Sequence, residues 1–300
     1  MNIRCETMLT DRLREDLEEL MTACQNAEPV TLRCPEDGSR YLLAYEAKTD
    51  AEEDGCLLAC LAVCETPDAL WECYAFTRPG SRRNGIFSAL LDEVCRMAEE
   101  AGDVELAFLS DENSPDGLAA ADALGMNLWY SEYQMTFDRG QKDFSALSGG
   151  EPCRIRLSRE IQMEDEEPEN DEAEQEDGIQ SWLFHAFSGS DGFGASGRIN
   201  VSDGPGASGG FGASDGPGGI LLGSCRILPY DDTRFYLYHL EIRQELRGKG
   251  WGKQLLAAVL HTLPYHAQVL LQVSSDNEPA LRLYQKTGFR LTETLSYYLY

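Results

Sequence analysis

Basic residues are scarce in this sequence. Its 300 residues include 25 lysines and arginines against 52 aspartates and glutamates, which gives a formal net charge of −27 at pH 7. Nucleic-acid binding depends on cationic patches, so this balance argues against a nucleic-acid partner. The acidic excess is compatible with a cationic amine as substrate, although it does not establish one.

Long apolar runs and paired cysteines are also lacking. No stretch approaches the ~18 apolar residues that a membrane span needs, and Met1 to Glu6 has no apolar signal-peptide core. The ten cysteines form no Cys-x-x-Cys pair, and Cys60 and Cys95 are among those that fall in apolar segments. We therefore expect a cytoplasmic protein in a reducing compartment, with no membrane partner.

Residues about 163–219 have the composition of an insertion. Glu164 to Asp177 contains ten acids and no base, and residues 188–219 are rich in glycine and serine. Such segments are typical of solvated loops, and an acidic arm that recruits substrate is the minority interpretation. Asp191, Asp203 and Asp215 recur every twelve residues, but they offer too few oxygen ligands for calcium, so no metal site is predicted.

The most informative stretch joins a strand to a helix through glycines. Residues 235–242 alternate as a strand does, and residues 255–263 carry the apolar stripe of a helix. Glycines between them allow successive N–H groups to converge at the positive end of the helix, which favours a bound phosphate or pyrophosphate. A Walker loop is excluded because Gln254 follows Gly252-Lys253. A dinucleotide fingerprint is excluded because the spacing is G-x-G-x-G after a hairpin.

Two motifs in this region resemble those of one enzyme family. Arg247-Gly248-Lys249-Gly250-Trp251-Gly252 resembles the Arg/Gln-x-x-Gly-x-Gly/Ala pyrophosphate loop of the GNAT (Gcn5-related N-acetyltransferase) superfamily. After a buried strand at 269–273, residues Asn277 to Phe289 resemble the Asn-x-x-Ala-x-x-Leu-Tyr-x-x-x-Gly-Phe signature of that family. The motifs occur in the family's order and spacing, and the resemblance covers residues about 220–300.

The order of strands and helices in residues 1–138 repeats that of the second half, which indicates an internal duplication. The resemblance therefore implies an α/β (α+β) chain of two tandem GNAT domains, each a mixed, mostly antiparallel sheet flanked by helices. The expected boundaries are 1–138 for a degenerate N-terminal domain, 139–152 for a linker and 153–300 for the C-terminal domain with its insertion. Mycothiol synthase, a tandem family member with a catalytic C-terminal half, is similar in this duplication only.

The first copy departs from the family pattern at two positions. Arg82-x-x-Gly85-x-Phe87 stands where the second copy has Arg247-x-x-Gly250-x-Gly252, so phenylalanine replaces the last glycine. Counting back four residues from Gly125 reaches Ala121, where the second copy has its tyrosine. We expect a structural first copy rather than a catalytic one, and its binding of acyl-CoA is left open.

The resemblance assigns acetyl-CoA as co-substrate and gives roles to residues of the second copy. It implies that backbone N–H groups hold the pyrophosphate, and these belong to Arg247, Gly248, Lys249, Gly250, Trp251, Gly252 and Lys253. Main-chain groups of Leu240 and Ile242 would pair with the pantetheine arm, and Asn277 would contact the cofactor nearby. Tyr284 would protonate the departing thiolate as general acid.

The general base stays open at this stage. Gln272 occupies one position where relatives carry a glutamate, and an amide cannot act as a base. Tyr238, His239 and Glu241 are the candidates; strict alternation predicts that His239 and Glu241 share one face of their strand.

The resulting expectation is an N-acyltransferase that acetylates a primary amine of a small molecule or peptide. A non-catalytic acyl-CoA-binding or scaffold protein is the alternative, and either a monomer or a dimer is compatible with the sequence.

Overall fold

The computed structural model describes residues 2–300 except 47–54, 103, 142–152, 162–179 and 189–219. Contacts divide the chain into two compact units. The N-terminal unit comprises Met1–Tyr133, Ser274–Asp276 and Glu293–Tyr300, and the C-terminal unit comprises Gln134–Val273 and Asn277–Thr292. Within the described residues, no helix is long and apolar enough to cross a membrane.

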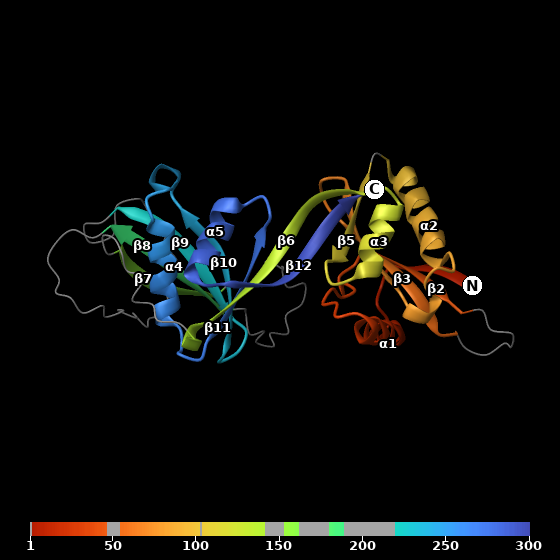
Figure 1. Cartoon of the computed structure of the whole chain (residues 1–300), viewed down its shortest axis with the longest axis horizontal. Coiled ribbons are helices and arrows are strands. Elements are labelled where there is room, and N and C mark those ends of the chain that lie inside the picture. Colours follow the sequence, from red (N-terminus) through yellow and green to blue (C-terminus); the bar gives the residue numbers. More distant parts are fainter. Residues whose placement is uncertain (1, 47–54, 103, 142–152, 162–179, 189–219) are drawn as a thin grey trace, which may run out of the picture. The chain divides into compact units, whose positions relative to one another are not determined.

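The N-terminal unit is a mixed sheet with helices on both faces (Figure 1). Its strands follow the order β1-β2-β3-β4-β5-β12-β6, in which β1 to β4 are antiparallel neighbours and β4 and β5 are parallel. The elements are β1 (Asn2–Glu6), α1 (Asp11–Ala27), β2 (Arg40–Tyr45), β3 (Leu57–Glu65), β4 (Leu70–Thr77), η1 (Pro79–Ser81), α2 (Ile86–Ala101), β5 (Glu105–Asp111), α3 (Pro115–Ala123) and β6 (Asn127–Asp138).

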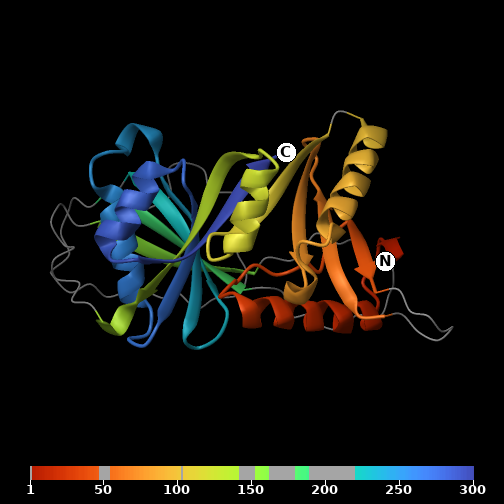
Figure 2. The same cartoon turned by 45° about the vertical axis from the view of Figure 1, so that its right-hand side comes forward.

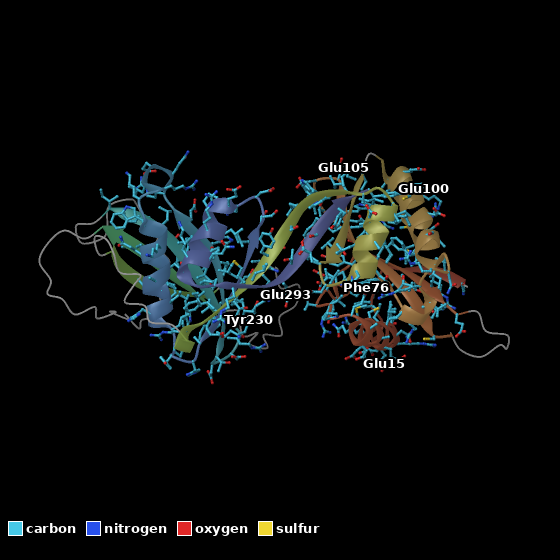
Figure 3. All side chains as sticks on the ribbon, in the orientation of Figure 1. Glu15, Phe76, Glu100, Glu105, Tyr230 and Glu293 are labelled. Carbon is cyan, nitrogen blue, oxygen red and sulfur yellow. The ribbon has the colours of Figure 1, made fainter. Side chains whose placement is uncertain are left out.

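Each face of this sheet is covered by a helix whose apolar spacing fits it. Thr10 caps α1 by accepting a hydrogen bond from the Leu13 N–H, and an apolar stripe of α1 packs with Tyr41 and Phe76. The opposite face packs under α2, where Leu90 and Val94 are buried. Figure 2 shows the two helices on opposite sides of the strands. Glu15 on the outer side of α1 points away from the sheet (Figure 3).

The C-terminal unit repeats the plan with strand order β6-β11-β10-β9-β8-β7. Strands β7 to β10 are antiparallel neighbours, and β10 and β11 are parallel. The elements are η2 (Arg139–Gln141), β7 (Cys153–Ile161), β8 (Gln180–Ser188), β9 (Leu221–Pro229), β10 (Arg234–Ile242), η4 (Gln244–Leu246), α4 (Trp251–Thr262), β11 (Gln268–Ser274), α5 (Glu278–Thr287) and β12 (Arg290–Leu299). This architecture confirms the predicted fold class of two tandem, mostly antiparallel α/β domains.

The last strand of each copy is divided between the two units. β12 pairs with β5 of the N-terminal unit, from Leu295 opposite Asp111 to Leu299 opposite Ala107. The second half of β6 belongs to the C-terminal unit, where β6 neighbours β11. The predicted boundaries of 1–138 and 153–300 did not include this division of β6 and β12. Most of the predicted linker and of the 163–219 insertion lies outside the described residues, except that Gln180–Ser188 forms β8.

Candidate active site

The glycine loop after β10 has a backbone that only glycine adopts readily. Gly248 and Gly250 have φ values of 76° and 83°, and a Cβ built on either would meet nothing within 4 Å. Arg247 anchors the loop because its Nε donates to the carbonyl oxygen of Ile242 at 3.0 Å. The loop thus bends tightly around open space immediately before α4.

The first turn of α4 adds unpaired donors to this space. Gly250 is the N-cap residue, and no side chain caps the helix. The first helical hydrogen bond in the turn is donated by Gln254 to Gly250, which leaves the N–H groups of Trp251, Gly252 and Lys253 at the positive helix end. An anion fits here for both geometric and electrostatic reasons.

Gly252 lets three elements approach one another. A Cβ at this position would lie 3.3 Å from Leu283 Cδ2 and 3.6 Å from Ile242 Cγ1. The end of β10, the start of α4 and the middle of α5 therefore meet at this glycine. Gly252 of the predicted pyrophosphate loop therefore lies beside Leu283, the residue that precedes Tyr284.

Strand β10 leaves its parallel neighbour just before the loop. Its register with β11 ends at Tyr236 opposite Leu270. Beyond this point β10 continues beside β9 alone among the described strands, with Ile242 opposite Gly223. The main-chain edge that includes Leu240 and Ile242 is consequently open along the diverging strands, as extended-chain pairing requires.

A β-bulge interrupts β10 in the same stretch. The register with β9 shifts by one residue between Tyr238 and Glu241, and His239 has a φ of 49°. The prediction that His239 and Glu241 share a face through strict alternation is therefore wrong, because the extra residue breaks the alternation. Bulges re-aim backbone groups, and this one turns the backbone where the strands separate.

The bulge depends on a glycine of β9 that the sequence interpretation missed. A Cβ on Gly223 would overlap the Glu241 carbonyl oxygen and lie 2.7 Å from Ile242 Cδ1. A glycine inside a strand is itself a signal of a bulge or of close backbone approach, so Gly223 was the available clue.

We expect Gly223→Ala to destabilise the protein by about 1–3 kcal/mol, because the backbone of β10 must move to admit the methyl group. Urea unfolding measures this loss. The matched control is Gly80→Ala, where nothing lies within 4 Å of the added Cβ and the change should stay within about 0.5 kcal/mol. Equal stability of the two variants would contradict the tight β9–β10 contact.

Tyr284 lies on α5 and is buried, with 6% of its surface exposed. Its ring packs on Phe289 at 5.6 Å between centroids. Burial, followed by the proximity of Cys225 and Tyr236, raises the pKa of Tyr284 to about 12. The phenol therefore keeps its proton at neutral pH, as a general acid must.

The side chains of Asn277 and Gln272 each accept a hydrogen bond within the C-terminal unit. Asn277 is the N-cap of α5, and its Oδ1 accepts the Ala280 N–H at 3.3 Å. Gln272 Oε1 accepts the Tyr236 hydroxyl at 3.1 Å. Gln272 thus has a structural partner, and its amide is no base.

The three candidate bases surround the bulge. The rings of Tyr238 and His239 meet edge to face at 5.2 Å. Glu241 is exposed and lies 3.7 Å from the Arg247 guanidinium.

The first copy keeps the loop shape but not its surroundings. Arg82 has the same φ and ψ as Arg247, −63° and 156°, and its Nε donates to the Thr77 carbonyl oxygen at 3.1 Å. Gly85 has a φ of 75°, and Arg83 takes the left-handed conformation of Gly248 with a φ of 64°. However, β4 pairs with β3 without a register shift, so the first copy lacks the bulge.

The comparison with known families decides the identity. The profile of the Acetyltransferase (GNAT) family matches residues 10–122 and again residues 159–289. The chain belongs to the GNAT family. Its two matches confirm the tandem duplication, and the chain is a GNAT-type N-acetyltransferase. No curated protein matches the sequence.

Solved structures share this fold along the full chain. A tandem GNAT protein from the clavulanic acid biosynthesis pathway is 16% identical, with a TM-score of 0.62 over 100% of this chain and 98% of its own. A GCN5-related N-acetyltransferase from Sphaerobacter thermophilus is 12% identical, with a TM-score of 0.60 over 99% of this chain and 95% of its own. These likenesses support the tandem GNAT architecture.

Proposed function

We propose that the C-terminal unit transfers an acetyl group from acetyl-CoA to a primary amine of a small molecule or peptide. The observation that carries this proposal is the bulge in β10, next to the open strand edge and the glycine loop. The first copy has the loop shape without the bulge and has Ala121 where Tyr284 would be.

The site residues supply three functions in this proposal. The N–H groups of Arg247, Gly248, Lys249, Gly250, Trp251, Gly252 and Lys253 hold the pyrophosphate. The open edge at Leu240 and Ile242 pairs with the pantetheine arm, and Asn277 lies at the start of α5 to contact the cofactor. An N–H freed by the bulge polarises the thioester carbonyl, as oxyanion-hole donors do.

The chemistry then follows an ordinary acyl transfer. The neutral amine nitrogen bonds to the thioester carbon, the carbon–sulfur bond breaks, and the sulfur takes the proton of Tyr284. The amine loses its extra proton to Tyr238, His239, Glu241 or water. The base then releases its proton to solvent and Tyr284 regains one, so the reaction is balanced without a further reactant.

The pH dependence of turnover tests whether the Tyr284 hydroxyl is protonated in the working enzyme. Its pKa of about 12 lies above the ordinary value of 10.0, so the acid form is lost only as the pH rises through the higher value. We expect kcat to show no alkaline decline from Tyr284 between pH 7 and about 10. A decline centred below pH 10 in the wild type that disappears in Tyr284→Phe would contradict this protonation state.

Thiol release from acetyl-CoA in the presence of a panel of amines tests the proposed function. The panel should include amino acids, polyamines, aminoglycosides and a peptide with a free N-terminus. Release that depends on one class of amine is the expected result. Binding of acetyl-CoA without release for any amine would favour the non-catalytic alternative.

A further inference from the structure

Three cysteines of the N-terminal unit lie on the side of the sheet that α1 covers. Cys60 and Cys64 are on β3, and their even spacing places both side chains on one face of the strand. Cys34 belongs to the segment between α1 and β2, and it packs against the core cluster that contains Cys60. Phe76, labelled in Figure 3, lies opposite Cys60 on β4 and belongs to the same cluster.

The thiols of Cys34 and Cys60 are in direct contact. A side-chain hydrogen bond with Cys34, followed by burial, raises the pKa of Cys60 well above its ordinary value. Cys34 also raises the pKa of Cys64, but only after burial, Asp37 and Glu72, and without a hydrogen bond. Cys60 is therefore the thiol that the Cys34 sulfur meets first.

Tyr41 holds the segment that carries Cys34 against the strands. The Tyr41 hydroxyl donates to the Pro35 carbonyl oxygen at 2.9 Å and accepts the Gly38 N–H at 2.9 Å. Tyr41 is itself buried and pairs with Ala62 of β3. Because the residue that follows Cys34 is bonded in this way, the Cys34 thiol is held beside β3.

The two thiols in contact differ in their access to solvent. Cys60 has 0% of its surface exposed, whereas Cys34 is half-buried. A small oxidant therefore reaches the Cys34 sulfur first, while burial protects Cys60 from direct oxidation. An accessible thiol beside a protected one is the arrangement in which an oxidised cysteine is resolved by a second cysteine.

We propose that Cys34 and Cys60 are an oxidative modification site and form a reversible disulfide when the protein meets hydrogen peroxide. The Cys34 sulfur attacks one peroxide oxygen, and the O–O bond breaks to give a sulfenic acid at Cys34 and a water molecule. The Cys60 sulfur then bonds to the Cys34 sulfur, and the sulfenic hydroxyl leaves as a second water with the Cys60 thiol proton. Two thiols are oxidised and one peroxide is reduced, and a dithiol reverses the reaction by exchange.

The disulfide ties the segment between α1 and β2 to β3. The other end of this segment is already fixed, because the Thr31 N–H and hydroxyl donate to Asp111 Oδ2 at 2.6 and 2.9 Å. A cross-link from Cys34 to Cys60 closes a loop that includes β2 and so restricts the unfolded chain. We expect peroxide treatment to raise the melting temperature by about 4–16 °C.

Peptide mapping of the full-length protein after equimolar hydrogen peroxide tests the pair. Free thiols are alkylated before digestion, so that a cross-linked peptide identifies its two cysteines. We expect a Cys34–Cys60 linkage in the wild type and its loss after reduction with dithiothreitol. Cys64→Ala is the matched control, because it removes the neighbouring thiol of β3 and should form the same linkage.

Two further variants separate the steps of the oxidation. Cys60→Ala should leave a sulfenic acid at Cys34 that dimedone labels, because the resolving thiol is absent. Cys34→Ser should form no linkage to Cys60 and show no rise in melting temperature with peroxide. Absence of the Cys34–Cys60 linkage, no dimedone label in Cys60→Ala or an unchanged melting temperature of the oxidised wild type would each overturn the proposal.

Discussion

Tyr284→Phe should lower kcat by about 100- to 10,000-fold while the affinity for coenzyme A stays within a few-fold. The substitution keeps the ring, so the packing against Phe289 at 5.6 Å is preserved. Only the hydroxyl is removed, and with it the proton that the thiolate receives. The loss therefore falls on the chemical step rather than on binding.

Thiol release measures kcat for this variant, and calorimetry measures coenzyme A affinity. The matched control is Tyr265→Phe, which removes a hydroxyl from a side chain that is 73% exposed and should leave kcat unchanged. Near-normal turnover in Tyr284→Phe would transfer the acid role to another group or to water.

Gly250→Glu should weaken coenzyme A binding more than about 100-fold, because a like charge at an anion site costs several kcal/mol. The space beside Gly250 is open, with nothing within 4 Å of an added Cβ. A glutamate there places its carboxylate where the pyrophosphate would be held by the loop N–H groups.

Gly85→Glu provides the matched control for Gly250→Glu. The two glycines have φ values of 75° and 83°, so the strain of a side chain in the left-handed region is similar in both variants. We expect Gly85→Glu to retain the wild-type affinity for coenzyme A. Unchanged affinity in Gly250→Glu would mean that the cofactor lies elsewhere.

Local pattern was sufficient to predict the strand and the helix on either side of the glycine loop. The alternation of residues 235–242 predicted β10, and the apolar spacing of residues 255–263 predicted α4. The short strand β1 was missed because its five residues carry no long alternating run. The loop residues and Tyr284 were identified through motifs, and the structure brings β10, α4 and α5 together at Gly252.

Features that depend on residues far apart in the chain could not be predicted from the sequence. The division of β6 and β12 between the units cannot be predicted locally, because the alternation of a strand indicates that it pairs but not with which strand. The bulge at His239 arises from the register against β9. The ion pair of Arg82 with Glu28 joins residues 54 positions apart, so it could be found only in the fold.

Acetyl transfer by the two glutamate variants tests most directly the claim that the C-terminal unit carries the reaction. Thiol release from acetyl-CoA, with an amine that supports wild-type turnover, is compared between Gly250→Glu and Gly85→Glu. The account predicts that Gly85→Glu turns over as the wild type does and that Gly250→Glu is inactive. Turnover retained in Gly250→Glu and lost in Gly85→Glu would place the reaction in the N-terminal unit and contradict the account.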